Sequence, residues 1–65
     1  MPITINGKQQ SLPEPQTVEQ LLASKGFTKG IAVAINGLFV PRATYTIQLV
    51  EEGDIIEILA PMQGG

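Results

Sequence analysis

The chain has 65 residues, of which 43% are hydrophobic, and six acidic against four basic residues give a net charge of −2. A domain of this length has room for one small core but hardly for an enclosed catalytic cavity. It contains no Cys and no His, which excludes disulfides, thiolate nucleophiles and zinc–thiolate sites and removes the commonest general base.

The charges also restrict the choice of partners. The four basic residues are scattered, so we expect no nucleic-acid partner. The apolar runs are far shorter than a bilayer span, so we expect no membrane association, and a chain without Cys suits a cytoplasmic protein. Glu51, Glu52 and Asp54 could bind a hard cation, but a solvated turn is the more ordinary interpretation, and we expect no metal.

The first twelve residues predict a β-hairpin. Residues 2–6 alternate between apolar and polar side chains, which is typical of a half-buried strand. Asn6-Gly7 is a strong hairpin signal, because both central positions of a type I′ turn need positive φ. A second strand follows over residues 8–12, and the prolines after it end the pairing.

Residues 18–25 predict a short helix. Thr17 and Gln20 have the spacing of a capping box, and Gly26 suits the left-handed position that closes a helix. The apolar stripe of this helix consists of Val18, Leu21 and Leu22. Phe27 comes directly after the helix and can fold back onto that stripe.

The second half of the chain predicts a further hairpin and a final strand. Residues 31–36 alternate branched side chains with alanines, and a second Asn-Gly pair leads into a strand over residues 38–40. Residues 42–50 are ambiguous and suggest an irregular loop with a short turn. Residues 54–59 form the last predicted strand, with Ile56 and Ile58 on one face.

Hairpin, helix, hairpin and strand together predict an α+β domain, in which one helix packs across one face of a mixed sheet. The pattern resembles the ubiquitin-like β-grasp. In that fold the first and last strands lie side by side and parallel at the centre of the sheet. We assign residues 1–60 to this domain and residues 61–65 to a flexible tail.

The tail ends in Gly64-Gly65, and the reactive group that it offers is the terminal carboxylate. Glycines lack Cβ atoms, so such a tail can thread a narrow channel and leave its carboxylate open to attack. A carboxylate is ionised at neutral pH and must be activated, for example as an anhydride with AMP. The chain has no phosphate-binding loop motif, so a partner would have to supply ATP chemistry. A frayed end or a cloning remnant is the alternative.

Beyond these features, the sequence resembles the ThiS/MoaD group of ubiquitin-like sulfur carriers, most closely the sulfur carrier of thiamine thiazole biosynthesis. The matching segments span nearly the whole chain: Asn6-Gly7-Lys8, Thr17-Val18-Glu19-Gln20-Leu21-Leu22, Val33-Ala34-Ile35-Asn36-Gly37, Val40-Pro41-Arg42, Asp54-Ile55-Ile56-Glu57-Ile58 and Gly64-Gly65. Tyr45 stands where many members of this group have Trp, and this exchanges one aromatic residue for another.

This resemblance implies a protein that is a substrate and carrier, not an enzyme, and that binds no cofactor itself. Gly65 would be adenylated, with ATP, by an adenylyltransferase resembling ubiquitin-activating enzymes. A cysteine desulfurase or another persulfide donor would convert it to a thiocarboxylate, and thiazole synthase would accept the sulfur. Met62, Gln63 and Gly64 would enter the partner's channel together with Gly65.

A docking surface is the other candidate site. Phe39, Leu59 and the alanines of residues 31–36 could form one, because a sheet covered by one helix leaves its other face open. Ordinary core or edge packing is the more common role of such residues. Arg42 could pair with an acidic residue of a partner, although a solvated arginine is more common.

Three other functions remain open at this point. The small subunit of molybdopterin synthase is a related thiocarboxylate carrier, but its relatives tend to be longer. A ubiquitin-like protein modifier would use the same activated Gly65 and end on a lysine amine. An interaction module with an accidental glycine tail would use no chemistry at Gly65.

Overall fold

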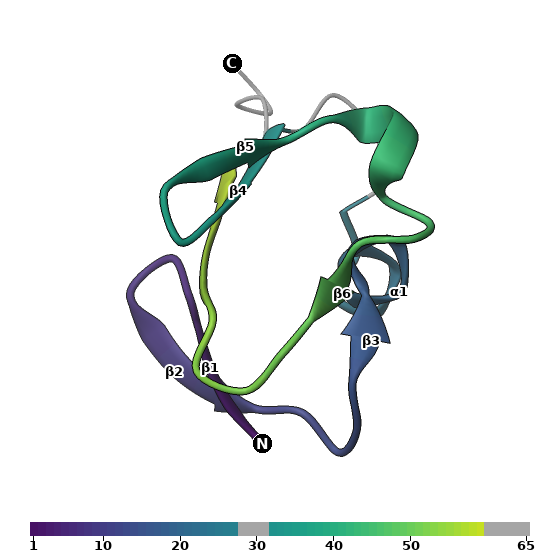
Figure 1. The fold of residues 1–65 in the computed structure, drawn as a ribbon. Coiled ribbons are helices and arrows are strands. Elements are labelled where there is room, and N and C mark those ends of the chain that lie inside the picture. The colour runs from purple at the N-terminus through teal and green to yellow at the C-terminus, as the bar shows by residue number, and fades with distance from the viewer. Residues whose placement is uncertain (28–31, 60–65) are drawn as a thin grey trace.

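The structure, a computed structural model, describes residues 1–27 and 32–59 (Figure 1). Its elements are β1 (Pro2–Ile5), β2 (Lys8–Ser11), β3 (Gln16–Thr17), α1 (Val18–Ser24), β4 (Ala32–Ile35), β5 (Leu38–Val40), the 3₁₀ helix η1 (Arg42–Thr44), β6 (Leu49–Val50) and β7 (Ile55–Leu59). Five strands form the main sheet in the order β2-β1-β7-β4-β5, while β3 and β6 form a small second sheet.

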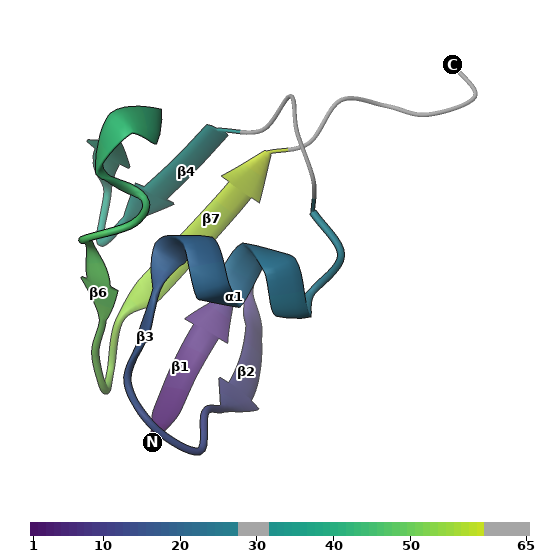
Figure 2. The same cartoon turned by 90° about the vertical axis from the view of Figure 1, so that its right-hand side faces the viewer.

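The main sheet is mixed, as predicted. β1 and β7 pair in parallel, with Thr4 opposite Ile55, and the other pairs of this sheet are antiparallel. β7 therefore lies in the middle of the sheet, between the first strand and the second hairpin, and α1 crosses one face (Figure 2). This arrangement confirms the β-grasp prediction.

Both Asn-Gly pairs form the turns that their sequence predicts. Asn6 has φ of 51° and Asn36 has φ of 52°, and the glycine after each also has positive φ. Asparagine tolerates this left-handed region better than most residues, and glycine adopts it without cost. The two hairpins are therefore determined by local backbone chemistry.

The helix begins at the predicted capping box. The Thr17 hydroxyl accepts a hydrogen bond of 3.1 Å from the Gln20 amide, and the Gln20 side chain accepts one of 2.9 Å from the Thr17 amide. α1 ends at Ser24, one residue before the predicted end, and Gly26 follows with φ of 83°. The amide of Phe27 donates to the Leu22 carbonyl at 3.0 Å, so Phe27 folds back against the core as expected.

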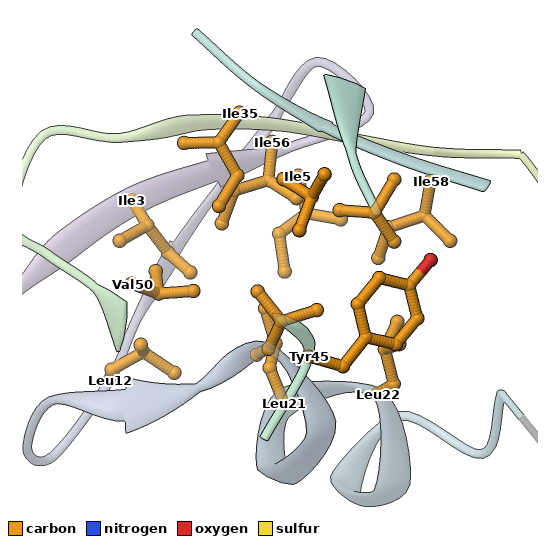
Figure 3. Close-up of a cluster of buried hydrophobic side chains, with 13 residues drawn as sticks. Ile3, Ile5, Leu12, Leu21, Leu22, Ile35, Tyr45, Val50, Ile56 and Ile58 are labelled. Atoms are coloured by element: carbon orange, nitrogen blue, oxygen red, sulfur yellow. The ribbon is translucent and has the colours of Figure 1, made fainter. Parts of the chain in front are cut away.

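The core lies between α1 and the face of the main sheet that it covers (Figure 3). It contains Ile3, Ile5, Leu12, Val18, Leu21, Leu22, Val33, Ile35, Val40, Tyr45, Val50, Ile56 and Ile58. Along β7 burial alternates as predicted, with Ile56 and Ile58 inside and the other three side chains exposed. The strands β1, β4, β5 and β7 of the main sheet thus each direct buried side chains of one face into the core.

Residues 42–50 are more ordered than the sequence indicates. The predicted short turn is present as η1, but the pairing of β6 with β3 was not predicted. The first amides of α1 explain why this segment lies against the helix. Val18 donates to the Gln48 carbonyl at 2.8 Å and Glu19 donates to the Tyr45 carbonyl at 3.0 Å, which satisfies two donors that a helix start leaves free.

Within residues 1–27 and 32–59, no helix has the length and apolar character needed to cross a bilayer.

Candidate functional site

The face of the main sheet opposite α1 carries large exposed apolar side chains. Phe39 on β5 is 69% exposed, Leu59 on β7 is 71% exposed, and Ile55 on β7 is 55% exposed. These side chains lie on the open face because strand residues alternate, and their neighbours Val40, Ile58 and Ile56 fill the core side. Core packing of Phe39 and Leu59 is therefore wrong, while the alternative of edge packing stays open for Phe39, because β5 is an edge strand.

The strand register shows how this open face is built. Ala34 lies between Phe39 on β5 and Glu57 on β7, and Ala32 lies opposite Leu59. The alanines are too small to fill the space between the larger neighbours, so a shallow hollow forms over β4. The residues that line it are Thr4, Asn6, Gly7, Ala32, Val33, Ala34, Phe39, Ile55, Glu57 and Leu59.

The hollow is mostly apolar and contains one carboxylate. Among the described residues that line it, Glu57 is the only charged one, and it lies on the central strand between Ile55 and Leu59. A partner that covers this hollow would have to present apolar side chains around a cation or a hydrogen-bond donor. Otherwise the Glu57 carboxylate would lose its water without compensation.

The structure places the remaining predicted site residues elsewhere. Arg42 is exposed at the start of η1, after Pro41, and is not among the residues that line the hollow. Met62, Gln63, Gly64 and Gly65 lie outside the described residues, as does the tail predicted over residues 61–65. The last described residue, Leu59, is part of the hollow, so the chain toward Gly65 continues from a residue of this surface.

The acidic turn before β7 has a structural role. One Asp54 carboxylate oxygen accepts a bond of 2.8 Å from the Glu51 amide, and the other accepts one of 3.0 Å from the Asn36 side chain. Within the described part of the chain, no three His, Cys, Asp or Glu side chains gather as a metal site would require. The interpretation of this segment as a turn is confirmed.

Sequence reasoning did not single out Ile55 as a surface residue. The alternation of residues 54–59 places Ile55 on the face opposite Ile56 and Ile58. Its side chain is nevertheless of the same type as those core residues, so residue type alone does not mark it as exposed. A second exposed group, Leu38, Ile47 and Leu49, was also missed. Leu38 and Leu49 line a groove beside β5 on the other side from the hollow, and no local pattern distinguishes them from core residues.

Comparison with known protein families identifies the chain. A family model described as the ThiS family matches residues 3–65. The chain belongs to the ThiS family. The match includes all nine helices and strands of the described fold apart from the first residue of β1, and it extends through Gly64 and Gly65.

Solved structures support the same family by shape. A crystal structure of the thiamine biosynthesis protein ThiS from Geobacter metallireducens has a TM-score of 0.86 and 30% identity, with full coverage of both chains. A solution structure of a thiamine biosynthesis protein from the same organism has a TM-score of 0.84 and 30% identity, covering all of this chain and 88% of the other. The β-grasp arrangement of this chain is therefore the same fold as that of these solved structures.

A curated relative links the ThiS-family chain to a larger protein. A protein named thiazole synthase from Paramagnetospirillum magneticum is 36% identical over 66 residues, which include all of this chain. The matched segment makes up 20% of that protein, so this chain spans about a fifth of the length of the curated relative it matches.

Proposed function

We propose that this ThiS-family chain carries sulfur as a thiocarboxylate on Gly65 and delivers it to thiazole synthase in thiamine biosynthesis. The observation that supports this most strongly is the family match, which continues through the terminal Gly64-Gly65 pair. The proposal takes Gly65 as the last residue of the working protein. The chain is then a protein substrate, and partner enzymes supply the catalysis.

The proposed reaction starts at the carboxylate of Gly65. One carboxylate oxygen attacks the α-phosphorus of ATP in an adenylyltransferase, which forms an acyl adenylate and releases pyrophosphate. A persulfide sulfur, from a cysteine desulfurase or another donor, then attacks the acyl carbon and AMP leaves. A thiol cleaves the resulting acyl disulfide and frees the thiocarboxylate. The chain has no Cys, so that thiol must come from a partner or from a small reductant.

The acceptor is inferred from the curated relative. In the protein named thiazole synthase, a segment similar to this whole chain is part of the same polypeptide. Covalent linkage keeps two interacting parts at high effective concentration. This relationship supports thiazole synthase as the acceptor of sulfur from Gly65.

Intact mass measurement tests the proposal directly. The protein, ending at Gly65, is incubated with ATP, an adenylyltransferase of a ThiS-family system, a persulfide donor and a thiol. We expect the mass gain of one oxygen replaced by one sulfur, and fragmentation should locate the sulfur to Gly65. An unchanged mass, with an adenylyltransferase shown to act on another carrier, would contradict the proposal.

The open face supplies a prediction about docking. We propose that the adenylyltransferase covers the hollow while it holds residues 60–65, because Leu59 lines the hollow and directly precedes those residues. The change Phe39→Ala should then raise the KM of the adenylyltransferase for the carrier about tenfold or more, since aromatic anchors dominate many interfaces.

Leu38→Ala is the matched control for this change. Leu38 is 73% exposed and precedes Phe39 on the same strand, but strand alternation directs it away from the open face. It should change the KM less than about twofold. Equal effects of the two substitutions would show that the enzyme does not recognise the hollow.

A further inference from the structure

The side chain of Asn6 reaches from the first hairpin turn to the end of β7. Its Oδ1 accepts a hydrogen bond of 2.8 Å from the Ile58 amide, and its Nδ2 donates one of 3.2 Å to the Ile58 carbonyl. The backbone amide of Asn6 also donates to the Ile56 carbonyl at 2.9 Å. One residue thus holds β7 at two successive inward-facing positions, 56 and 58.

These bonds continue the pairing of β1 with β7 after β1 has ended. Along this parallel pair, the Thr4 amide donates to the Asp54 carbonyl and the Asn6 amide donates to the Ile56 carbonyl. The next bonds would need further extended backbone, but the chain turns away at Asn6 and Gly7. A carboxamide has the same donor and acceptor as a peptide group, so the Asn6 side chain replaces the missing part of the strand.

β7 is consequently held from both sides up to its end. Val33 of β4 pairs with Ile58 from the other side, and Ala32 pairs with Leu59. Without the Asn6 side chain, the Ile58 backbone would have no hydrogen-bond partner on the side of β7 that faces β1. The end of β7 would then be held by β4 alone. Strand ends that have lost pairing on one side open more readily than the rest of a sheet.

We infer that Asn6 is a positioning residue for the reacting terminus. Leu59 follows Ile58 directly, and residues 60–65 connect it to Gly65. If the end of β7 opened, a partner enzyme would have to restore the strand up to Leu59 before it could place Gly65, which costs conformational entropy on binding. This inference rests on the proposed function of Gly65.

Asn36, in the second Asn-Gly turn, provides a matched control. Its φ equals that of Asn6 within a degree, and its Oδ1 accepts a bond of 2.9 Å from the Ile55 amide. Its Nδ2 donates to Asp54, so this side chain holds the start of β7, far from the end that leads to Gly65. The changes Asn6→Gly and Asn36→Gly each remove two side-chain bonds to the β7 region and leave a residue that adopts positive φ without strain.

Amide hydrogen exchange tests the clamp without any enzyme. In the full-length protein, Asn6→Gly should accelerate exchange at Ile58 about tenfold relative to Asn36→Gly, once both rates are corrected for global stability. Unchanged protection of Ile58 in Asn6→Gly would overturn the inference.

Adenylation kinetics test the positioning role. At a temperature where both variants are fully folded, Asn6→Gly should raise the KM of the adenylyltransferase about fivefold and leave kcat within about twofold. Asn36→Gly should change neither value by more than about twofold. Asn6 also lines the hollow and Asn36 does not, so a raised KM supports the positioning role only when exchange at Ile58 is accelerated as well. Equal KM values for the two variants would mean that Asn6 acts only on stability, and this would overturn the inference. If the unsubstituted protein is not adenylated at all, the proposed function fails and the positioning role fails with it.

Discussion

Deleting Gly65 should abolish formation of the thiocarboxylate and leave the domain folded. The deletion moves the carboxylate back by one residue, or about 3.5 Å along an extended chain. A misplacement of about 1 Å at a reacting group can already cost about a hundredfold in rate. We therefore expect the kcat/KM of adenylation to fall by at least about a thousandfold, measured as ATP-dependent release of pyrophosphate.

Stability measurements and a second variant complete this test. Residue 65 lies six positions beyond the end of β7, so the free energy of unfolding should change by less than about 0.5 kcal/mol. Gly65→Ala keeps the length and the terminal carboxylate and adds only a Cβ, so it should retain more activity than the deletion. A normal adenylation rate after deletion of Gly65 would rule out the carboxylate of this residue as the site of chemistry.

Replacing Ile56 by Ala should remove most of the stability of the domain. Ile56 is 1% exposed on the central strand, with β1 on one side and β4 on the other. Truncation of a buried isoleucine costs about 2–5 kcal/mol, because the cavity it leaves is filled only partly. A chain of this size has a free energy of unfolding of about 3–10 kcal/mol, so the variant should be at the limit of folding. Urea denaturation measures the change.

The preceding residue is the control for this prediction. Ile55 is the same residue type on the same strand, but it is 55% exposed on the open face. Ile55→Ala should cost less than about 1 kcal/mol and should instead weaken adenylyltransferase binding, because Ile55 lines the hollow. Similar denaturation midpoints for the two variants would contradict the assignment of opposite faces.

The proposed carrier, a protein modifier and a carrier for molybdopterin synthase differ in the molecule that reacts with the activated Gly65. A protein modifier would share the adenylation of Gly65 but would leave isopeptide adducts on lysine. A carrier for molybdopterin synthase would share the thiocarboxylate and differ only in the protein that accepts the sulfur. Adding purified thiazole synthase together with a deoxyxylulose phosphate and a glycine-derived imine to the thiocarboxylate form, and following the return of the carrier to its original mass, distinguishes these cases.

Local chemistry determined the turns, the helix start and the faces of the last strand. Asn6-Gly7 demands positive φ at two successive positions, and this demand is visible in the sequence because few other residue pairs meet it. The capping box at Thr17 is equally local, since its two hydrogen bonds join residues three apart. The alternation over residues 54–59 predicted the burial of Ile56 and Ile58, because the period of a strand is a property of the backbone.

Only the tertiary structure decided what residues 42–50 do. The strands β3 and β6 have two residues each, which is too short for a period to be recognised. Their pairing depends on Val50 entering the core and on the first amides of α1, which find acceptors in the Gln48 and Tyr45 carbonyls. These partners are distant in the sequence, so no local pattern predicts them.

The same reason limits what the sequence says about the candidate site. Gly65 is predicted as the reacting residue from composition and family resemblance, whereas the exposure of Phe39 follows from its place on an edge strand and on the open face. Asn6 shows the contrast within one residue. Its backbone role in the turn is evident from the sequence, but its side-chain bonds to Ile58 span 52 positions and exist only because the fold places β1 beside β7.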